Sequence, residues 1–258
     1  MTIRFYSLIV FMLMFPVQSN SRPLPAGRGQ SAGFKNGYIS VLSTYSPSFM
    51  YDLSGYLKSF GLDEADKNYL SYGFELHGFF NPALGIGIKY LRGGQVQRKI
   101  GTVEYQYCCV ENDIKLDRSV ESAFSRFGLS LSYRKVLAGK LEFFGAFGAS
   151  YGRPSIIISQ DYGDQTFEEM WDSFDPGSGL LSRYNRSVKY TTGVYVFEAE
   201  NGVRFFASPR VAAGASVGYI YGMFSDKSEI NYGFESVRNV PDLDISGLIY
   251  RATIYFGY

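Results

Sequence analysis

The single histidine, His77, is the first residue in this sequence that could carry acid–base chemistry. Glu75 lies two residues earlier, so in a β-strand both side chains would point to the same face. The two residues could therefore form a proton-transferring pair. They precede a short turn, however, far from any pocket that loops could build, and we favour a hydrogen-bonded polar pair inside the fold. With no second histidine, most metal sites and catalytic triads are disfavoured.

A stretch of acidic residues in a predicted loop could bind Ca²⁺ through carboxylate oxygens. Its members are Asp161, Asp164, Glu168, Glu169, Asp172 and Asp175. Their spacing matches no defined Ca²⁺ loop, so we favour a solvated loop and predict neither a metal nor a cofactor. Within the same stretch, Trp171 and Phe174 could form a helical contact surface with Met170.

The two cysteines, Cys108 and Cys109, are adjacent and fit no zinc, redox or lipid-attachment spacing. Three states stay open for them: a strained vicinal disulfide, a bond to another chain, and two free thiols.

The N-terminal residues of the chain indicate export. Arg4 precedes an apolar run from Phe5 to Val17, and Val17-Gln18-Ser19 is a small-residue cleavage signal. We therefore predict a signal peptide over 1–19 and a loose N-terminal leader over 20–36. The run is too short to span a hydrocarbon core of about 30 Å as a helix. A formal net charge of +1 gives no reason to expect a nucleic-acid partner.

The elements that must position these residues are strands, because apolar and polar residues alternate throughout 37–258. The alternation predicts eight strands: Gly37–Tyr45, Tyr69–Phe80, Leu84–Leu91, Phe124–Val136, Leu141–Ile158, Val188–Ala207, Val211–Phe224 and Asp244–Tyr258. Long loops (46–68, 93–120, 159–187 and 225–243) alternate with short turns (81–83, 137–140 and 208–210). Within the second loop, Val103–Val110 could extend a strand above the membrane. Residues 37–258 are thus predicted to form an all-β, eight-stranded antiparallel up-and-down transmembrane β-barrel with short periplasmic turns and long extracellular loops.

The two faces of the predicted strands differ. The apolar face carries no Asp, Glu, Lys or Arg in its spanning part, as a lipid-facing surface requires. The opposite face is rich in Gly, Ser and Ala, which suits the narrow interior of an eight-stranded barrel. Its charged residues should pair across the interior: Glu75, Lys89, Arg126, Arg134, Glu142, Glu198, Glu200, Arg204 and Arg251. A secreted soluble barrel is the alternative.

Asn201-Gly202 complicates the strand count. Asn-Gly is a strong hairpin signal, and a hairpin here would give nine or ten strands. We favour a β-bulge at Gly202, because Ser208-Pro209-Arg210 already provides a turn.

The mature chain resembles the small outer-membrane β-barrel superfamily of the OmpA-type transmembrane domain, OmpX and OmpW. Its last strand resembles the signal read by the barrel assembly machinery, with Arg251, Phe256 and Tyr258 as the matching residues and Thr253 where glycine is usual. The resemblance implies location in the cell outer membrane, with lipid and the assembly machinery as partners.

The resemblance covers no active-site motif, so it implies a location but hardly any activity. We expect no enzyme, but a structural or surface-interaction protein whose loops bind an unknown extracellular ligand. A small-solute pore is the first alternative. A lipid-modifying enzyme is the second, and its deacylase kind resembles a Ser/His/Glu arrangement, which an inward-facing His77 fits poorly.

Overall fold

A computed structural model describes residues 36–46, 57–58, 62, 68–107, 110–162, 186–230, 235–236 and 245–257. The predicted signal peptide, nearly all of the leader, both cysteines, Trp171 and Tyr258 lie outside these residues. Within them, no helix is long and apolar enough to cross a membrane.

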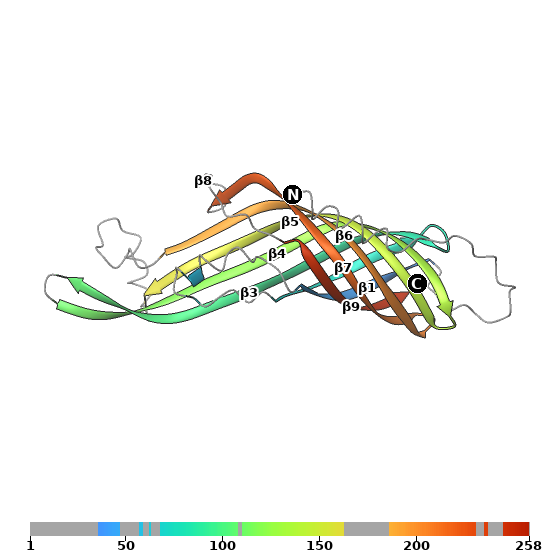
Figure 1. Cartoon of the computed structure of the whole chain (residues 1–258), viewed down its shortest axis with the longest axis horizontal. Coiled ribbons are helices and arrows are strands. Elements are labelled where there is room, and N and C mark those ends of the chain that lie inside the picture. The colour runs from blue at the N-terminus through green and yellow to red at the C-terminus, as the bar shows by residue number, and fades with distance from the viewer. Residues whose placement is uncertain are drawn as a thin grey trace.

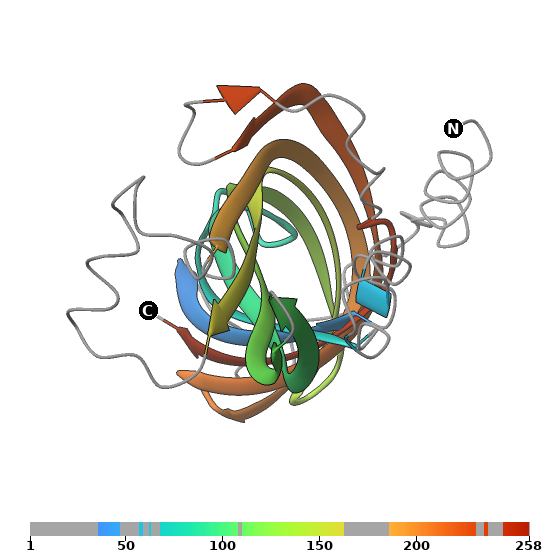
Figure 2. The same cartoon turned by 90° about the vertical axis from the view of Figure 1, so that its left-hand side faces the viewer.

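The described chain is almost entirely β-strand. Its strands are β1 (Gly37–Ser46), β2 (Tyr69–Phe79), β3 (Leu84–Tyr107), β4 (Val110–Ala138), β5 (Leu141–Tyr162), β6 (Arg186–Ser208), β7 (Val211–Ile230), β8 (Glu235–Ser236) and β9 (Gly247–Gly257). Each long strand pairs antiparallel with its neighbour in the chain, and β9 pairs with both β7 and β1. The long strands therefore close into a ring, which Figure 2 shows end-on. Because β8 is only two residues long and pairs with β7 alone, the barrel has eight strands, as predicted.

Short turns close one end of the barrel, at the right of Figure 1. In the β2–β3 turn, the side-chain oxygen of Asn81 accepts hydrogen bonds from the backbone N–H groups of Ala83 and Leu84. Gly139 adopts a φ of 46° in the β4–β5 turn, a conformation that glycine reaches without strain. Ser208 Oγ caps the β6–β7 turn through the N–H groups of Arg210 and Val211. These are the three turns that the sequence predicts.

The predicted loop 93–120 is wrong. β3 and β4 pair without interruption from Leu84 opposite Tyr133 to Tyr107 opposite Val110, so this segment is one long hairpin. It is the extension that reaches farthest to the left in Figure 1. The segment is polar and its alternation is weak, so the sequence pattern misreads two paired strands as a loop. β5 also continues to Tyr162 and β7 to Ile230.

Asn201-Gly202 forms neither a hairpin nor a bulge. Gly202 pairs in regular register with Phe144 on β5 and Ser216 on β7, so the bulge predicted there is wrong. A Cβ on Gly202 would lie 2.5 Å from the carbonyl oxygen of Ala215, which shows that glycine is needed for close strand packing. The register of β6 against β7 shifts instead between Thr192 and Val194 and again between Phe206 and Ser208.

Candidate functional site

The charged residues predicted to face inward all lie on the interior face of the barrel. The structure divides them into two groups. A central cluster contains Glu75, Lys89, Arg126, Glu198, Glu200 and Arg251, and a turn-end cluster near the short turns contains Arg134, Glu142 and Arg204. They are inward because side chains alternate along each strand, and they are buried because an eight-stranded interior has no room for bulk water.

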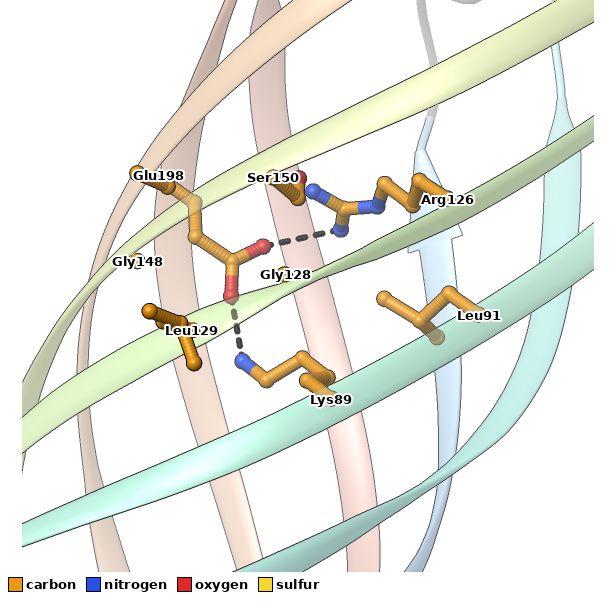
Figure 3. Close-up of a pocket in the computed structure, with 9 residues that line it drawn as sticks. Lys89, Leu91, Arg126, Gly128, Leu129, Gly148, Ser150 and Glu198 are labelled. Carbon is orange, nitrogen blue, oxygen red and sulfur yellow. Dashed lines mark hydrogen bonds and ion pairs between the residues drawn. The ribbon is translucent and has the colours of Figure 1, made fainter.

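Glu198 is the hub of the central cluster. It forms ion pairs with Lys89, with Arg126 at 2.8 Å and with Arg251 at 3.4 Å. Figure 3 shows Lys89 and Arg126 reaching it from β3 and β4. Glu200, the next inward residue of β6, pairs with Arg251 and lies 3.4 Å from Lys89. The side chain of Glu198 is only 5 % exposed, so each partner replaces water that the carboxylate has lost.

The central cluster is electrically balanced. Three carboxylates, those of Glu75, Glu198 and Glu200, face three cations, those of Lys89, Arg126 and Arg251. Polar side chains that the sequence analysis did not single out complete it: Thr44 Oγ1 accepts from Arg251 Nε at 2.9 Å, Ser216 donates to Glu200 at 3.1 Å, and Ser130 donates to Glu75 at 2.5 Å. Serine and threonine at inward positions were the available signal, but only the barrel register shows which charged group each one contacts.

A small cavity lies beside Glu198, lined by Lys89, Leu91, Arg126, Gly128, Leu129, Gly148, Ala149, Ser150 and Glu198 (Figure 3). Its free volume is about 10 Å³. That is close to the minimum for one water molecule, so the cavity is a packing gap and cannot hold a substrate.

The turn-end cluster joins ions to aromatic rings. Glu142 accepts from Arg204 at 2.5 Å and lies 3.7 Å from Arg134. The Arg204 guanidinium carbon lies 4.0 Å from the ring centre of Tyr255 and 4.8 Å from that of Tyr38. Two guanidinium groups share one carboxylate here, and the electron-rich ring faces stabilise the surplus positive charge.

His77 lies between the two clusters. Its Nε2 is 2.8 Å from Ser132 Oγ, and its Nδ1 is 3.3 Å from Glu75 Oε1. The three side chains thus have the order of a serine–histidine–glutamate triad. His77 is fully buried, however, and its ring stacks on Tyr38 with 4.8 Å between ring centres. Ser132 and Glu75 are buried as well, so the arrangement satisfies buried polar groups.

An apolar cluster fills the interior at the long-loop end. Its members are Leu57, Leu62, Tyr69, Val120, Phe124, Ile156, Val194, Val196, Ile220, Ile245 and Ile249. Leu57 and Leu62 come from the connection between β1 and β2, and the others lie on strands or just before β9. From one end to the other, the described interior is therefore apolar, then ionic, then ionic and aromatic.

The outer surface has the opposite composition. Large apolar side chains are about half exposed along the strands, for example Ile39 at 50 %, Phe74 at 53 %, Phe127 at 57 % and Phe205 at 54 %. On β6, the exposed Phe205 lies ten positions after the exposed Tyr195. That is about 34 Å along a strand, or about 26 Å along the barrel axis at a tilt of about 40°. The exposed band is as tall as a hydrocarbon layer.

Other predicted site residues are placed as follows. Arg251 of the predicted assembly signal is buried, and Phe256 is 48 % exposed on the outer face. Among the described residues no group of three His, Cys, Asp or Glu could hold a metal ion. Of the predicted acidic stretch, only Asp161 is described.

No family model matches the chain, and no curated protein matches it. Among solved structures, it is similar to Neisserial surface protein A (12 % identity, TM-score 0.43), covering 88 % of this chain and 99 % of that one. It is also similar to the outer membrane protein OprG from Pseudomonas aeruginosa (13 %, TM-score 0.44, covering 88 % and 98 %).

A third similar structure is Ail, the attachment invasion locus protein of Yersinia pestis, in complex with the heparin analogue sucrose octasulfate (12 %, TM-score 0.41, covering 86 % and 99 %). These identities and TM-scores carry no conclusion about activity or ligands. The strand pairing of the chain itself makes it an eight-stranded antiparallel β-barrel.

Proposed function

We propose that this chain is an outer-membrane β-barrel with a structural or surface-interaction role, and that it conducts no solutes. The observation that supports this proposal best is the combination of a filled interior with an exposed apolar exterior. A soluble barrel would place its apolar residues inside and its charges outside. Here ionic groups are buried and aliphatic groups are exposed, and only a lipid environment stabilises that arrangement.

The filled interior argues against a pore. A solute would have to pass the apolar cluster at the long-loop end, the central ion pairs and the ring of Tyr38 beside Arg204. Separating the buried Glu198 carboxylate from its cationic partners would cost several kcal/mol, which is comparable to the free energy of unfolding of a small protein.

An enzyme is also disfavoured. Ser132, His77 and Glu75 are the best catalytic constellation in the described residues, and all three are buried. A lipid-modifying enzyme would need its nucleophile on the surface that meets lipid, but these side chains point to the barrel axis.

The surface for interaction is the sheet that β3 to β6 extend beyond the apolar band (Figure 1). Its outer face combines exposed Val96 and Ile100 with an ion pair between Arg98 and Asp117. Hydrogen bonds from the Arg98 guanidinium hold the pKa of the Asp117 carboxyl below its ordinary value. A rigid sheet of mixed polarity suits protein or glycan contacts, and the extracellular partner binds there and at the neighbouring loops.

Two measurements on the same refolded protein test this proposal. Refolded into lipid vesicles, the mature chain should run at a different position on a gel before and after boiling, because folded barrels resist the detergent. Planar bilayers containing this heat-modifiable form should show no steady conductance. Reproducible single-channel steps would refute the closed interior, and failure to insert would refute the membrane location.

A further inference from the structure

Two arginines and a serine form a row on the outer surface of three adjacent strands. Arg92 of β3 pairs with Ser125 of β4, and Ser125 pairs with Arg153 of β5. All three lie in the outward register, and both arginines are exposed. Adjacent strands are about 4.8 Å apart, so the two arginine Cα atoms are about 10 Å apart, with Ser125 midway.

Neither arginine has an ion pair or hydrogen bond to a described residue through its guanidinium. Elsewhere in the described chain, arginines in strands have such partners: Arg98 pairs with Asp117, and Arg126 pairs with Glu198. On the outward face of β3, β4 and β5, the nearest described carboxylate to Ser125 is that of Glu121, four residues along β4, or about 14 Å. The row is thus a local concentration of positive charge without a counter-ion among the described residues.

The row also lies at the edge of the apolar band. The next outward residue toward the short turns is aromatic on each strand: Tyr90 below Arg92, Phe127 below Ser125 and Tyr151 below Arg153. Tyr90, Phe127 and Tyr151 are themselves paired neighbours. In a membrane barrel, such aromatic residues mark the interface between hydrocarbon and headgroups. Arg92 and Arg153 therefore emerge at the depth of lipid headgroups on the long-loop side.

We propose that Arg92, Ser125 and Arg153 bind a phosphate group of an anionic lipid in the outer leaflet. Each guanidinium has to reach only about 5 Å toward the middle of the row, which an extended arginine side chain spans. A single phosphate above Ser125 can then accept charge-assisted hydrogen bonds from both guanidinium groups and one from the serine hydroxyl. The acyl chains of the same lipid lie along Phe127 and its aromatic neighbours.

This site rests on the proposed membrane location. We assign a lipid to it and not a soluble anion, because the aromatic residues directly beneath the row can contact the acyl chains of a lipid, whereas a soluble anion has no apolar part to place there. A soluble phosphate would find an exposed, fully hydrated arginine pair, where charge pairing in water is weak.

The test uses the full mature chain in nanodiscs of zwitterionic phosphatidylcholine, to which a phosphorylated glycolipid, lipid A, is added in increasing amounts. Bound lipid A is counted by native mass spectrometry after the nanodisc lipid is removed. We expect saturable binding by the wild type. The double variant Arg92→Gln/Arg153→Gln should bind about tenfold to thirtyfold more weakly, because each arginine near a membrane surface contributes about fivefold. Arg210→Gln, which changes an exposed arginine of the β6–β7 turn at the opposite end of the barrel, is the control and should bind as the wild type does.

Each outcome separates the two proposals. Equal binding by the wild type and the double variant overturns the site, as does equal binding of lipid A from which the phosphates have been removed. Displacement of lipid A by millimolar inorganic phosphate would mean that the row binds free anions, and would overturn the lipid assignment. Heat-modifiable mobility is recorded for every sample: inserted protein without lipid A binding refutes this inference alone, whereas failure to insert refutes the membrane location as well.

Discussion

Replacing Glu198 with glutamine should be among the most destabilising single changes in the barrel interior. The change keeps the shape of the side chain but leaves Lys89, Arg126 and Arg251 with two carboxylates in place of three. The central cluster would then carry one uncompensated buried charge. Breaking a buried ion pair in this way typically costs about 3–5 kcal/mol. Since small proteins are stable by about 5–15 kcal/mol, about a fifth or more of the stability would be lost.

The assay is urea unfolding of the vesicle-inserted barrel, followed by the loss of the heat-modifiable band. The midpoint should fall while the slope of the transition stays constant, because the surface exposed on unfolding is unchanged. Glu121→Gln, at an exposed position of β4, is the matched control and should unfold within about 0.5 kcal/mol of the wild type.

A second variant distinguishes lost charge balance from local damage. Adding Lys89→Met to Glu198→Gln removes the excess cation and retains an unbranched side chain of similar length. Most of the lost stability should return, because replacing a buried ion pair by apolar or neutral groups is often close to neutral. The reasoning is wrong if Glu198→Gln unfolds within 1 kcal/mol of the wild type, or if the double variant is no more stable than the single one.

Three further predictions concern other parts of the chain. Gly73→Ala should destabilise or block barrel folding, since a Cβ there would collide with the backbone of β3, whereas Gly78→Ala has nothing within 4 Å and should fold normally; both are scored by the heat-modifiable band. Ser132 should not react with a fluorophosphonate probe in the folded barrel, and a labelled Ser132 in peptide mass spectrometry would reopen the enzyme hypothesis. NMR titration of the Asp117 carboxyl should give a pKa below the ordinary value of about 3.9, and Arg98→Gln should raise it. Because the folded pKa is depressed, any stability from this pair is present above the unfolded pKa and is lost as the pH falls through the folded one.

The sequence determined the architecture because strand alternation is a local property. Residues such as Tyr250 and Arg251 are assigned to opposite faces by their neighbours in the chain alone, and the structure places the first 48 % exposed and the second buried. The strand number follows for a similar reason: Asn81-Pro82, Gly139 and Ser208-Pro209 form turns from their own side chains and backbone preferences.

Local pattern was insufficient where water replaces lipid around the strands. From Val96 to Ile100 the side chains on both faces of β3 are at least partly exposed, so alternation fades although the pairing of β3 with β4 continues to Tyr107 opposite Val110. The bulge at Gly202 was wrong for a related reason. That glycine serves close packing against Ala215 and Phe144, which are distant in the sequence.

Only the tertiary structure decided which inward charges meet. Alternation places both Glu142 and Glu198 on the inward face of their strands. The register of the barrel then determines that Glu142 pairs with Arg204, whereas Glu198 pairs with Lys89 and Arg126. The same holds outside, where Arg92 and Arg153 are 61 residues apart in the chain and become neighbours only because each lies beside Ser125. Strand faces follow from the alternation of side chains along one strand, whereas partners follow from the register between strands, which is set by closure of the whole ring.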